Sequence, residues 1–447
     1  MVEQRIESTS SLSIRSVTKT SGRSSRASKY TKAIDVDVAE ETIAPVIDYE
    51  TDIEDEPEKE LNEYDSAATG RKLYQDACKL YGVIPVTYFF RYMEQEVFDI
   101  SHRQLGPSAT RAMAVALTVN TKILRLLMSD NGIGADGAIA LSEMLVENNY
   151  LQELDIAQNE IEKTGCDSLF SMLLENTTIQ KLVLDQCKLN NECISGMIVP
   201  LAQAHKLEEL VLSGNKFTNG DLLARTLAEN ASLKVVDLSW NTFRGRDGFQ
   251  LLKGLKESVC LTSVDVSHCG LDDTCATILR SYLSENTVIE EFKASCNNFR
   301  LVSAVALGDG LRESKSLKKI QLCRNPFLTE GCLAIGKGLA GNTDSTLELL
   351  DLDDIVTGKE FDELNLKELF PKLTIISANS WMEKKSRKPR KDPIQLLKDY
   401  MEAQGLRLVD FFNKLDTDGS MSLSRAEFKD GILMAGIPMT ESEIEGK

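Results

Sequence analysis

Histidine and tryptophan are scarce in this 447-residue chain, which contains three histidines and two tryptophans. Histidine-based catalysis and zinc binding therefore depend on His102, His205 and His268, and the ten cysteines form no Cys-x-x-Cys pair. The sequence also lacks a GxxxxGK[S/T] phosphate loop, an HExxH zinc motif and the nucleophile elbow of hydrolases. These absences predict that the protein is not an enzyme.

Positive charge is in deficit as well, because 51 lysines and arginines face 69 aspartates and glutamates, a formal net charge of −18. Binding to phosphate groups requires a basic surface, so the charge argues against nucleic acid and for a protein partner with a basic or mixed surface. No apolar run reaches the roughly 20 residues that span a membrane, and the first residues lack the apolar stretch of a signal peptide. Together with the scattered thiols, these features predict a cytoplasmic protein.

The first 65 residues contain few of the apolar residues that build a core. Their first half is rich in serine with scattered basic residues, and their second half is acidic from Asp48 to Glu60. A segment of this composition buries too little apolar surface to offset the entropy of ordering, so residues 1–65 are predicted to be a disordered tail. Residues 66–97 are rich in aromatics and are predicted to form a helical N-terminal cap.

A repeat occupies residues 98–380 and determines the fold prediction. The segments ILRLLMSDNGI, from Ile123, and LQELDIAQNEI, from Leu151, match at a shift of 28 residues. The same template returns at Ile179, Leu207, Leu233, Leu261, Ile289 and Leu317. One amide or thiol position in it is occupied by Asn131, Asn159, Cys187, Asn215, Asn241, Cys269, Asn297 and Asn325. A period of this length is typical of a solenoid.

Each repeat combines a strand with a helix. Alternating apolar residues such as Leu154 and Ile156 indicate a short strand with one buried face. The spacing of Ala138, Leu141 and Leu145 indicates a helix. Because helices are wider than strands, the sequence predicts an α/β solenoid with a parallel concave sheet and convex helices. The asparagines and cysteines after each strand are expected to form a ladder of buried hydrogen bonds to backbone groups.

Repeats of the form LxxLxLxxNxIxxxGxxxLxxxL, over residues 93 to 355, resemble the ribonuclease-inhibitor-like type of leucine-rich repeat. The whole chain, with the EF-hand-like segment described below, resembles the leucine-rich repeat-containing 74 proteins. This resemblance implies a leucine-rich-repeat horseshoe that serves as a protein–protein interaction scaffold. The wider subfamily includes the Ran GTPase-activating protein, so the resemblance leaves regulation of a small GTPase as an alternative function.

The concave face offers a candidate partner site. One column of residues lies between the two leucine positions of each strand, and it contains aspartate in four of nine repeats, at Asp155, Asp237, Asp265 and Asp351. The last column before the asparagine or cysteine contains Trp240, and a tryptophan on an open strand surface suits an interface anchor. We predict a partner-binding site at Trp240, Asp237, Asp265 and Asp155. The alternatives are a tryptophan that packs on a neighbouring strand and aspartates that form a solvated face.

A basic run, KKSRKPRK from Lys384 to Lys391, lies in a predicted linker at residues 381–393. Its charge suits a nuclear-import signal or an electrostatic contact, and a linker without further function is the alternative. The linker is expected to separate the repeats from a small helical unit at residues 394–447.

Within this last unit, DTDGSMSLSRAEF (residues 416–428) resembles an EF-hand calcium loop. A hard cation such as Ca²⁺ takes several oxygen ligands from one short loop. The expected ligands are Asp416, Asp418, Ser420, Ser422, Ser424 and Glu427. Met421 occupies the position of the usual glycine and Ser420 replaces a common carboxylate, so the predicted calcium binding is weak. A metal-free helix-loop-helix is the alternative.

EF-hands usually work in pairs, but this sequence contains one such loop. The segment from Thr440 to Glu443 has the pattern of a helix start, and the chain ends at Lys447. We therefore expect either that the chain is truncated there or that dimerisation supplies the second loop.

Overall fold

The computed structural model describes residues 69–378, 393–416, 422–435 and 437. The chain divides into two compact units, residues 1–378 and 379–447, which are described separately below. The predicted tail and the basic run from Lys384 to Lys391 lie outside the described residues. The predictions for those segments therefore stay predictions.

The first unit contains, among its described residues, one parallel sheet of eleven strands whose order follows the chain. The strands are β1 (Val97–Asp99), β2 (Arg125–Leu127), β3 (Glu153–Asp155), β4 (Lys181–Val183), β5 (Glu209–Val211), β6 (Val235–Asp237), β7 (Ser263–Asp265), β8 (Glu291–Lys293), β9 (Lys319–Gln321), β10 (Leu349–Leu352) and β11 (Thr374–Ser377). Neighbouring strands pair with their middle residues opposite each other, as Leu126 lies opposite Leu154. The predicted parallel sheet is confirmed.

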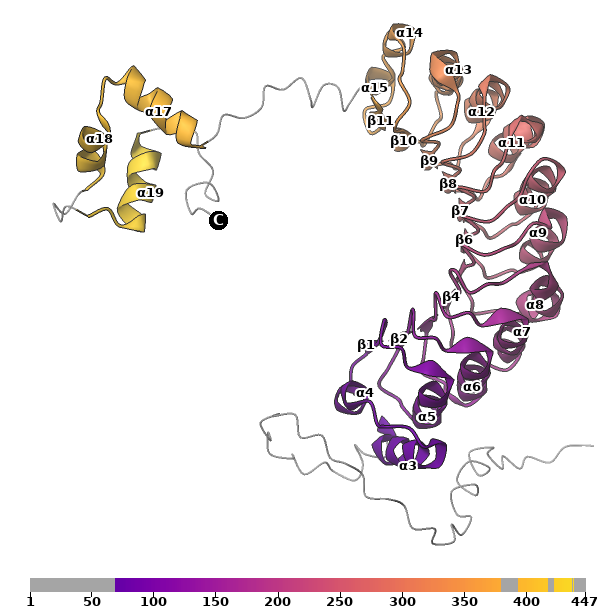
Figure 1. The fold of residues 1–447 in the computed structure, drawn as a ribbon. Helices are drawn as coiled ribbons and strands as arrows, with labels where there is room; N and C mark the ends of the chain where they lie inside the picture. Colours follow the sequence, from indigo (N-terminus) through magenta and orange to yellow (C-terminus); the bar gives the residue numbers. More distant parts are fainter. Residues whose placement is uncertain (1–68, 379–392, 417–421, 436, 438–447) are drawn as a thin grey trace, which may run out of the picture. The chain divides into compact units, whose positions relative to one another are not determined.

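Helical segments connect each strand to the next. They are α5 (Gly106–Leu117), α6 (Gly134–Glu147), α7 (Glu162–Met172), α8 (Asn191–Gln203), α9 (Gly220–Ala228), α10 (Arg246–Lys256), the 3-10 turn η1 (Asp273–Cys275) with α11 (Ala276–Glu285), α12 (Leu301–Glu313), α13 (Leu328–Ala340), and α14 (Lys359–Asp362) with α15 (Leu366–Leu369). In Figure 1 these helices line the outer side of an arc and the strands its inner side. Helices about 10 Å wide cannot stack at the 4.8 Å spacing of strands, so the sheet becomes concave.

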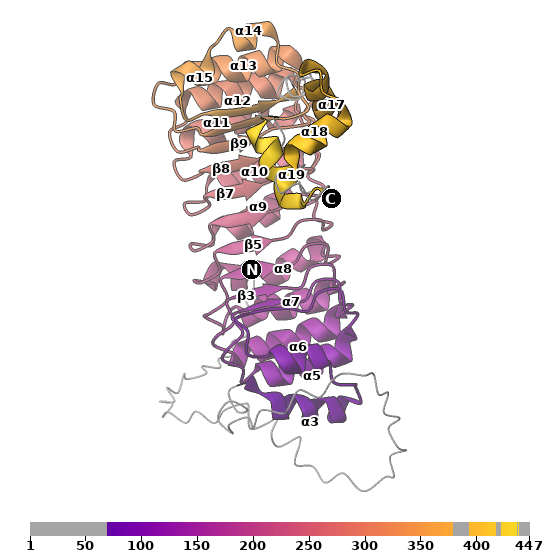
Figure 2. The same cartoon turned by 90° about the vertical axis from the view of Figure 1, so that its left-hand side faces the viewer.

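The leucine positions of the template build the core of the first unit. The side chain at the middle of each strand from β1 to β10 is at most 1% exposed, at Phe98, Leu126, Leu154, Leu182, Leu210, Val236, Val264, Phe292, Ile320 and Leu350. On the helical side, Ala138, Leu141 and Leu145 of α6 are also buried, as their spacing predicted. Figure 2 shows the repeats stacked in chain order. In such a stack, neighbouring repeats bury each other's apolar residues.

Buried asparagines form the expected ladder behind the strands. The Nδ2 group of Asn159 donates hydrogen bonds to the carbonyl oxygens of Met128, Ile156 and Ala157, each at 2.9 Å. Its Oδ1 atom accepts one from the backbone N–H of Asn131 at 2.8 Å. One side chain thus joins two repeats and satisfies backbone groups that lie away from solvent.

Cysteine serves in the same ladder at two positions. The Sγ atom of Cys187 donates to the carbonyl oxygen of Ile156 at 3.3 Å, and that of Cys269 donates to Leu238 at 3.2 Å. Both thiols are buried. A small side chain with a weak donor therefore fits the slot, as expected from the sequence.

A second ladder of buried asparagines, which was not predicted, lies where each helix returns to the sheet. The Nδ2 group of Asn148 donates to the carbonyl oxygens of Leu117 at 2.7 Å and Asn120 at 3.0 Å. Its Oδ1 atom accepts from the backbone N–H groups of Tyr150 and Leu151. The side chains that share this role are Asn120, Asn148, Asn176, Asn230, Asn286 and Asn342. These asparagines follow the same repeat in the sequence, and this spacing could have predicted the second ladder.

Segments that depart from the template cover both ends of the sheet. At one end, α3 (Arg71–Tyr81) and α4 (Thr87–Tyr92) bring the rings of Tyr74 and Phe89 edge to face at 4.8 Å. At the other end, Phe361 of α14 is buried and β11 extends the sheet. Strand β11 was not predicted, because its TIIS sequence contains neither the leucines nor the asparagine of the template.

The second unit contains, in its described residues, the helices α17 (Pro393–Ala403), α18 (Leu408–Leu415) and α19 (Arg425–Met434). Its small core includes Phe411, Leu415, Ile432 and Ile437. Among all described residues of the chain, no helix is long and apolar enough to cross a lipid bilayer.

Candidate functional site

The residue before each ladder asparagine or cysteine has a left-handed backbone conformation. These residues are Asp130, Gln158, Gln186, Gly214, Trp240, His268, Cys296 and Arg324, and Asp354 has the same conformation before Ile355, with φ between 51° and 63° in all of them. Glycine adopts this conformation freely, whereas other residues lose about 1 kcal/mol there. The turn is held by the next repeat, as the N–H of Trp240 donates to the carbonyl oxygen of Ser267 at 3.0 Å. Large side chains at this column are therefore displayed at some cost in stability.

Trp240 and His268, neighbours in this column, stack on each other. Their ring centroids lie 3.7 Å apart and their planes differ by 10°. Trp240 nevertheless remains 62% exposed. The tryptophan thus packs on the adjacent repeat, as one of the alternatives proposed, and also leaves a large aromatic surface open to solvent.

Asp237 and Asp265 lie side by side beneath this stack, at paired positions of β6 and β7. The Oδ1 atom of Asp237 accepts a hydrogen bond from the N–H of Ser239 at 2.8 Å, and that of Asp265 accepts one from Ser267 at 2.9 Å. Burial raises the pKa of the Asp265 carboxyl, and the neighbouring charge of Asp237 raises it further. Two adjacent carboxylates of this kind repel each other and attract a cation.

A shallow hollow of about 350 Å³ opens on the concave face at Trp240 and Asp265. It is lined by Ser239, Trp240, Asp265, Ser267, His268, Ser295, Cys296, Gln321, Cys323, Arg324 and Asp353. The two cations nearby already have acidic partners, since Lys293 Nζ lies 3.8 Å from Glu291 and Arg324 Nε lies 2.6 Å from Asp354. In the part of the chain that the structure describes, neither Asp237 nor Asp265 forms an ion pair.

Asp155, the remaining residue of the predicted partner site, lies apart from the others. It belongs to β3, three strands from β6, which corresponds to roughly 14 Å along the sheet. Its Oδ1 atom accepts hydrogen bonds from the N–H of Ala157 and the hydroxyl of Ser129, both at 2.9 Å. The structure therefore brings Trp240, Asp237 and Asp265 together and leaves Asp155 in a local turn.

Charges on strands β2 to β5 are paired with one another across the sheet. Lys181 Nζ lies 3.5 Å from Glu153 and 3.0 Å from Glu209, and Arg125 also pairs with Glu153. The corresponding positions of β6 and β7 are uncharged. Asp237 and Asp265 are thus adjacent carboxylates without an ion pair among the described residues, with Lys293 opposite Asp265 on β8.

The sequence reasoning missed His268, Cys296, Cys323 and Arg324 as parts of the hollow. His268, Cys296 and Arg324 occupy the same column as Trp240 in successive repeats, and this shared position could have predicted that they lie beside it. Cys323 lies one residue earlier in its repeat, at a position where the two preceding repeats have serine and the next has Asp353.

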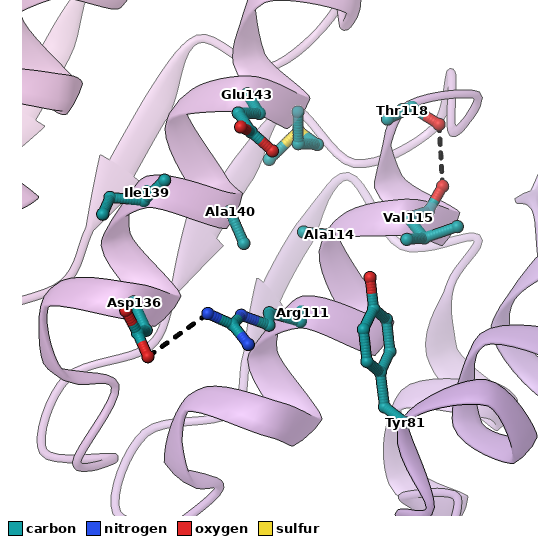
Figure 3. A pocket seen from close by; sticks show the side chains of 10 residues that line it. Tyr81, Arg111, Ala114, Val115, Thr118, Asp136, Ile139, Ala140 and Glu143 are labelled. Atoms are coloured by element: carbon teal, nitrogen blue, oxygen red, sulfur yellow. Dashed lines mark hydrogen bonds and ion pairs between the residues drawn. The ribbon is translucent and has the colours of Figure 1, made fainter. Parts of the chain in front are cut away.

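A second hollow, of about 240 Å³, lies between α5 and α6 on the helical side of the first unit (Figure 3). Tyr81 and Arg111 project into it, and Arg111 Nη2 lies 3.2 Å from Asp136 Oδ2. Since its one cation already has a carboxylate partner, no ligand chemistry follows from this lining.

The predicted calcium loop lies between α18 and α19 in the second unit. Its expected ligands Asp418 and Ser420, and also Met421, lie outside the described residues. Glu427 Oε2 accepts hydrogen bonds from the backbone N–H of Ser424 at 3.0 Å and from its hydroxyl at 2.7 Å. The Ser424 hydroxyl oxygen accepts one from the N–H of Glu427 at 3.2 Å, which completes a capping box at the start of α19.

This capping box was not predicted, although the Ser-x-x-Glu pattern from Ser424 to Glu427 indicates it. It brings together two of the predicted calcium ligands, Ser424 and Glu427. Among the described residues, no group of three or more histidine, cysteine, aspartate or glutamate side chains is arranged to hold a metal ion.

The 28-residue repeat, the parallel concave sheet and the asparagine ladder define a leucine-rich-repeat fold. The "Leucine Rich repeat" family model matches residues 119–142, 147–170 and 257–275. Leucine-rich repeats generally mediate protein–protein interaction. The ribonuclease-inhibitor-like type and the likeness to the leucine-rich repeat-containing 74 proteins remain predictions.

Solved structures that are similar to this chain include the following two. One is the TLR13–ssRNA13 complex, at 20% identity and a TM-score of 0.38, covering 60% of this chain and 33% of the matched chain. The other is the Rad7 and Elc1 complex in yeast, at 12% identity and a TM-score of 0.38, covering 71% of this chain and 94% of the matched chain. This chain thus spans a third of the length of the matched TLR13 chain.

Proposed function

We propose that the protein is an interaction scaffold that binds its partner in the hollow at Trp240. The exposed indole beside Asp237 and Asp265 carries this proposal. Partly exposed tryptophans dominate the binding energy of many interfaces, because they bury a large apolar surface at little cost in side-chain entropy. The stack on His268 further limits the motion of the indole before binding.

The partner presents a lysine or arginine to this hollow. The adjacent carboxylates of Asp237 and Asp265 have no ion pair among the described residues, and Lys293, which lies opposite Asp265, pairs with Glu291. A cation from the partner therefore meets two carboxylates that can each accept an ion pair. The exposed indole of Trp240 adds a cation–π contribution of about 1 kcal/mol. The net charge of −18 also favours the approach of a basic surface over long range.

Selection of peptides from a displayed random library on the full chain tests this function. We expect the selected peptides to be enriched in arginine and lysine, and Trp240→Ala to weaken their binding about 30-fold, or 2 kcal/mol. The double variant Asp237→Asn with Asp265→Asn should weaken them as well. Gln186→Ala is the matched control, because it removes an exposed side chain from the same left-handed column after β4, two strands away from β6, and outside the lining of the hollow.

Peptide binding measured by fluorescence anisotropy decides the outcome. Selected peptides without basic residues would contradict the proposed partner chemistry. Equal affinities for wild type, Trp240→Ala and the double aspartate variant would contradict the location of the site.

We also propose that the loop between α18 and α19 binds Ca²⁺ weakly. The support is its set of hard oxygen donors, with Ser424 and Glu427 held together at the start of α19. Calcium binding requires the Glu427 carboxylate to turn from Ser424 toward the ion, which adds to the weakness caused by Met421. Dimerisation through the second unit remains a prediction, which analytical ultracentrifugation tests. Regulation of a small GTPase also remains a prediction, which GTP hydrolysis assays test.

Isothermal titration of the full chain with Ca²⁺ tests the calcium proposal. We expect a dissociation constant of roughly 0.1–1 mM for wild type and no measurable heat for Glu427→Gln. Glu402→Gln is the control, since Glu402 is an exposed carboxylate on α17. Identical heats for wild type and Glu427→Gln would exclude this loop as a calcium site.

A further inference from the structure

Two cysteines, Cys296 and Cys323, line the hollow beside Trp240. All ten cysteines of the chain are free thiols, and seven of them are buried. The three partly exposed thiols are Cys260, Cys296 and Cys323. Cys260 has a separate position, where its Sγ atom donates to the carbonyl oxygen of Ala231 at 3.0 Å. Two of the three accessible thiols therefore belong to one site.

The backbone holds these two cysteines within reach of a disulfide bond. The N–H of Cys296 donates a hydrogen bond to the carbonyl oxygen of Cys323 at 2.9 Å. With standard covalent geometry, this bond keeps their Cα atoms within about 7 Å of each other. Disulfide bonds in proteins join Cα atoms that lie about 4.4 to 6.8 Å apart.

The surroundings give the two thiols different roles. Burial raises the pKa of the Cys323 thiol, while a hydrogen bond with Ser295 lowers it by less. Arg324 lies beside the pair, and its own pKa is raised first by Asp354 and then by the charge of Cys296. The guanidinium of Arg324 thus lies near Cys296, so we assign the first attack to Cys296 and the second step to Cys323.

We propose that Cys296 and Cys323 form a reversible disulfide with a peroxide as oxidant, and that this bond changes the hollow at Trp240. The Cys296 sulfur attacks one peroxide oxygen, the O–O bond breaks, and a sulfenic acid forms. The departing hydroxide takes up the proton that the Cys296 thiol gives up and leaves as the first water. The Cys323 sulfur then attacks the Cys296 sulfur, the S–O bond breaks, and the second water leaves with the thiol proton. Two thiols lose two electrons and hydrogen peroxide gains them.

The position of the bond links it to partner binding. Cys296 follows Trp240 and His268 in the left-handed column, so the disulfide ties the turn of one repeat to the next at the edge of the hollow. The bond draws the two side chains together and reduces the space for a partner side chain. This effect on binding rests on the proposed function, whereas formation of the bond does not. A dithiol reverses the bond by thiol–disulfide exchange.

Alkylation of the full chain before and after treatment with hydrogen peroxide, followed by peptide mass spectrometry, tests the bond itself. We expect Cys296 and Cys323 to lose their reactivity together and to appear as one linked peptide pair lighter by two hydrogens. Dithiothreitol should restore both thiols, and Cys260 should be alkylated throughout. The proposal would be overturned if both thiols could still be alkylated after peroxide treatment. It would also be overturned by a disulfide between two chains or by oxidation of Cys296 without a disulfide.

A second measurement tests the effect of the disulfide on the hollow without using a partner. In a Trp381→Phe background, fluorescence reports Trp240 alone, because the chain contains two tryptophans. We expect peroxide to shift the Trp240 emission when both Cys296 and Cys323 are present, and also in the matched control Cys260→Ser. The variant Cys323→Ser should show no shift. An unchanged emission despite a mapped disulfide would overturn the link to the hollow. If the basic peptides bind neither form while the emission shifts, the proposed function fails and the redox device stands.

Discussion

Replacement of Asn159 by alanine is expected to lower the free energy of unfolding of the first unit by about 3 kcal/mol. The Oδ1 atom of Asn159 accepts hydrogen bonds from the backbone N–H groups of Asn131 at 2.8 Å and Ile133 at 3.2 Å. Both groups are buried, so the substitution leaves two donors without an acceptor or a route to water. Each such donor costs about 1–3 kcal/mol.

Asn159→Cys is expected to cost only about 1 kcal/mol, because a thiol retains part of the hydrogen bonding. The chain itself uses cysteine at this slot in Cys187, whose Sγ atom donates to Ile156 and interacts with the backbone of Asn159. Thermal and urea unfolding of the full chain measure the difference. Asn149→Ala is the exposed control. An equal loss for Asn159→Ala and Asn149→Ala would contradict a structural role for the ladder.

Replacement of Gly338 by alanine is expected to destabilise the first unit by about 3 kcal/mol. A Cβ atom at Gly338 lies 1.9 Å from the carbonyl oxygen of Gly308 and 2.4 Å from its carbonyl carbon. These contacts join the backbones of α12 and α13, which cannot move aside as a flexible side chain does. The free-energy cost of moving the two helices apart is larger than the gain of about 1 kcal/mol in helix propensity that alanine brings.

Gly341→Ala is the matched control for this effect. The nearest atom to its Cβ position is Arg312 Nε at 3.2 Å, which belongs to the end of a flexible side chain. Thermal unfolding followed by circular dichroism should show a large decrease in Tm for Gly338→Ala and a small change for Gly341→Ala. Similar Tm values for both variants would show that α12 and α13 tolerate a wider spacing.

Much of the candidate site was visible in the sequence as columns of the repeat. Trp240, Asp237 and Asp265 were predicted together because they occupy outward positions of adjacent repeats. The structure places Trp240 and Asp265 in one hollow and Asp237 directly beside Asp265. Asp155 shares the column of Asp237 but lies three strands away. A column shows which way a residue faces, and only the number of intervening strands shows how far it lies from the others.

The 28-residue period by itself determined the solenoid of this protein, its parallel sheet and its buried asparagine ladder. Each of these follows from local alternation of apolar residues and from the need to satisfy backbone groups in every repeat. The tertiary structure decided how neighbouring repeats combine their exposed side chains. The stack of Trp240 on His268, the thiol pair of Cys296 and Cys323 and the added strand β11 all depend on contacts between repeats. Such contacts are set by strand register and by left-handed turns, which the identity of single residues does not reveal.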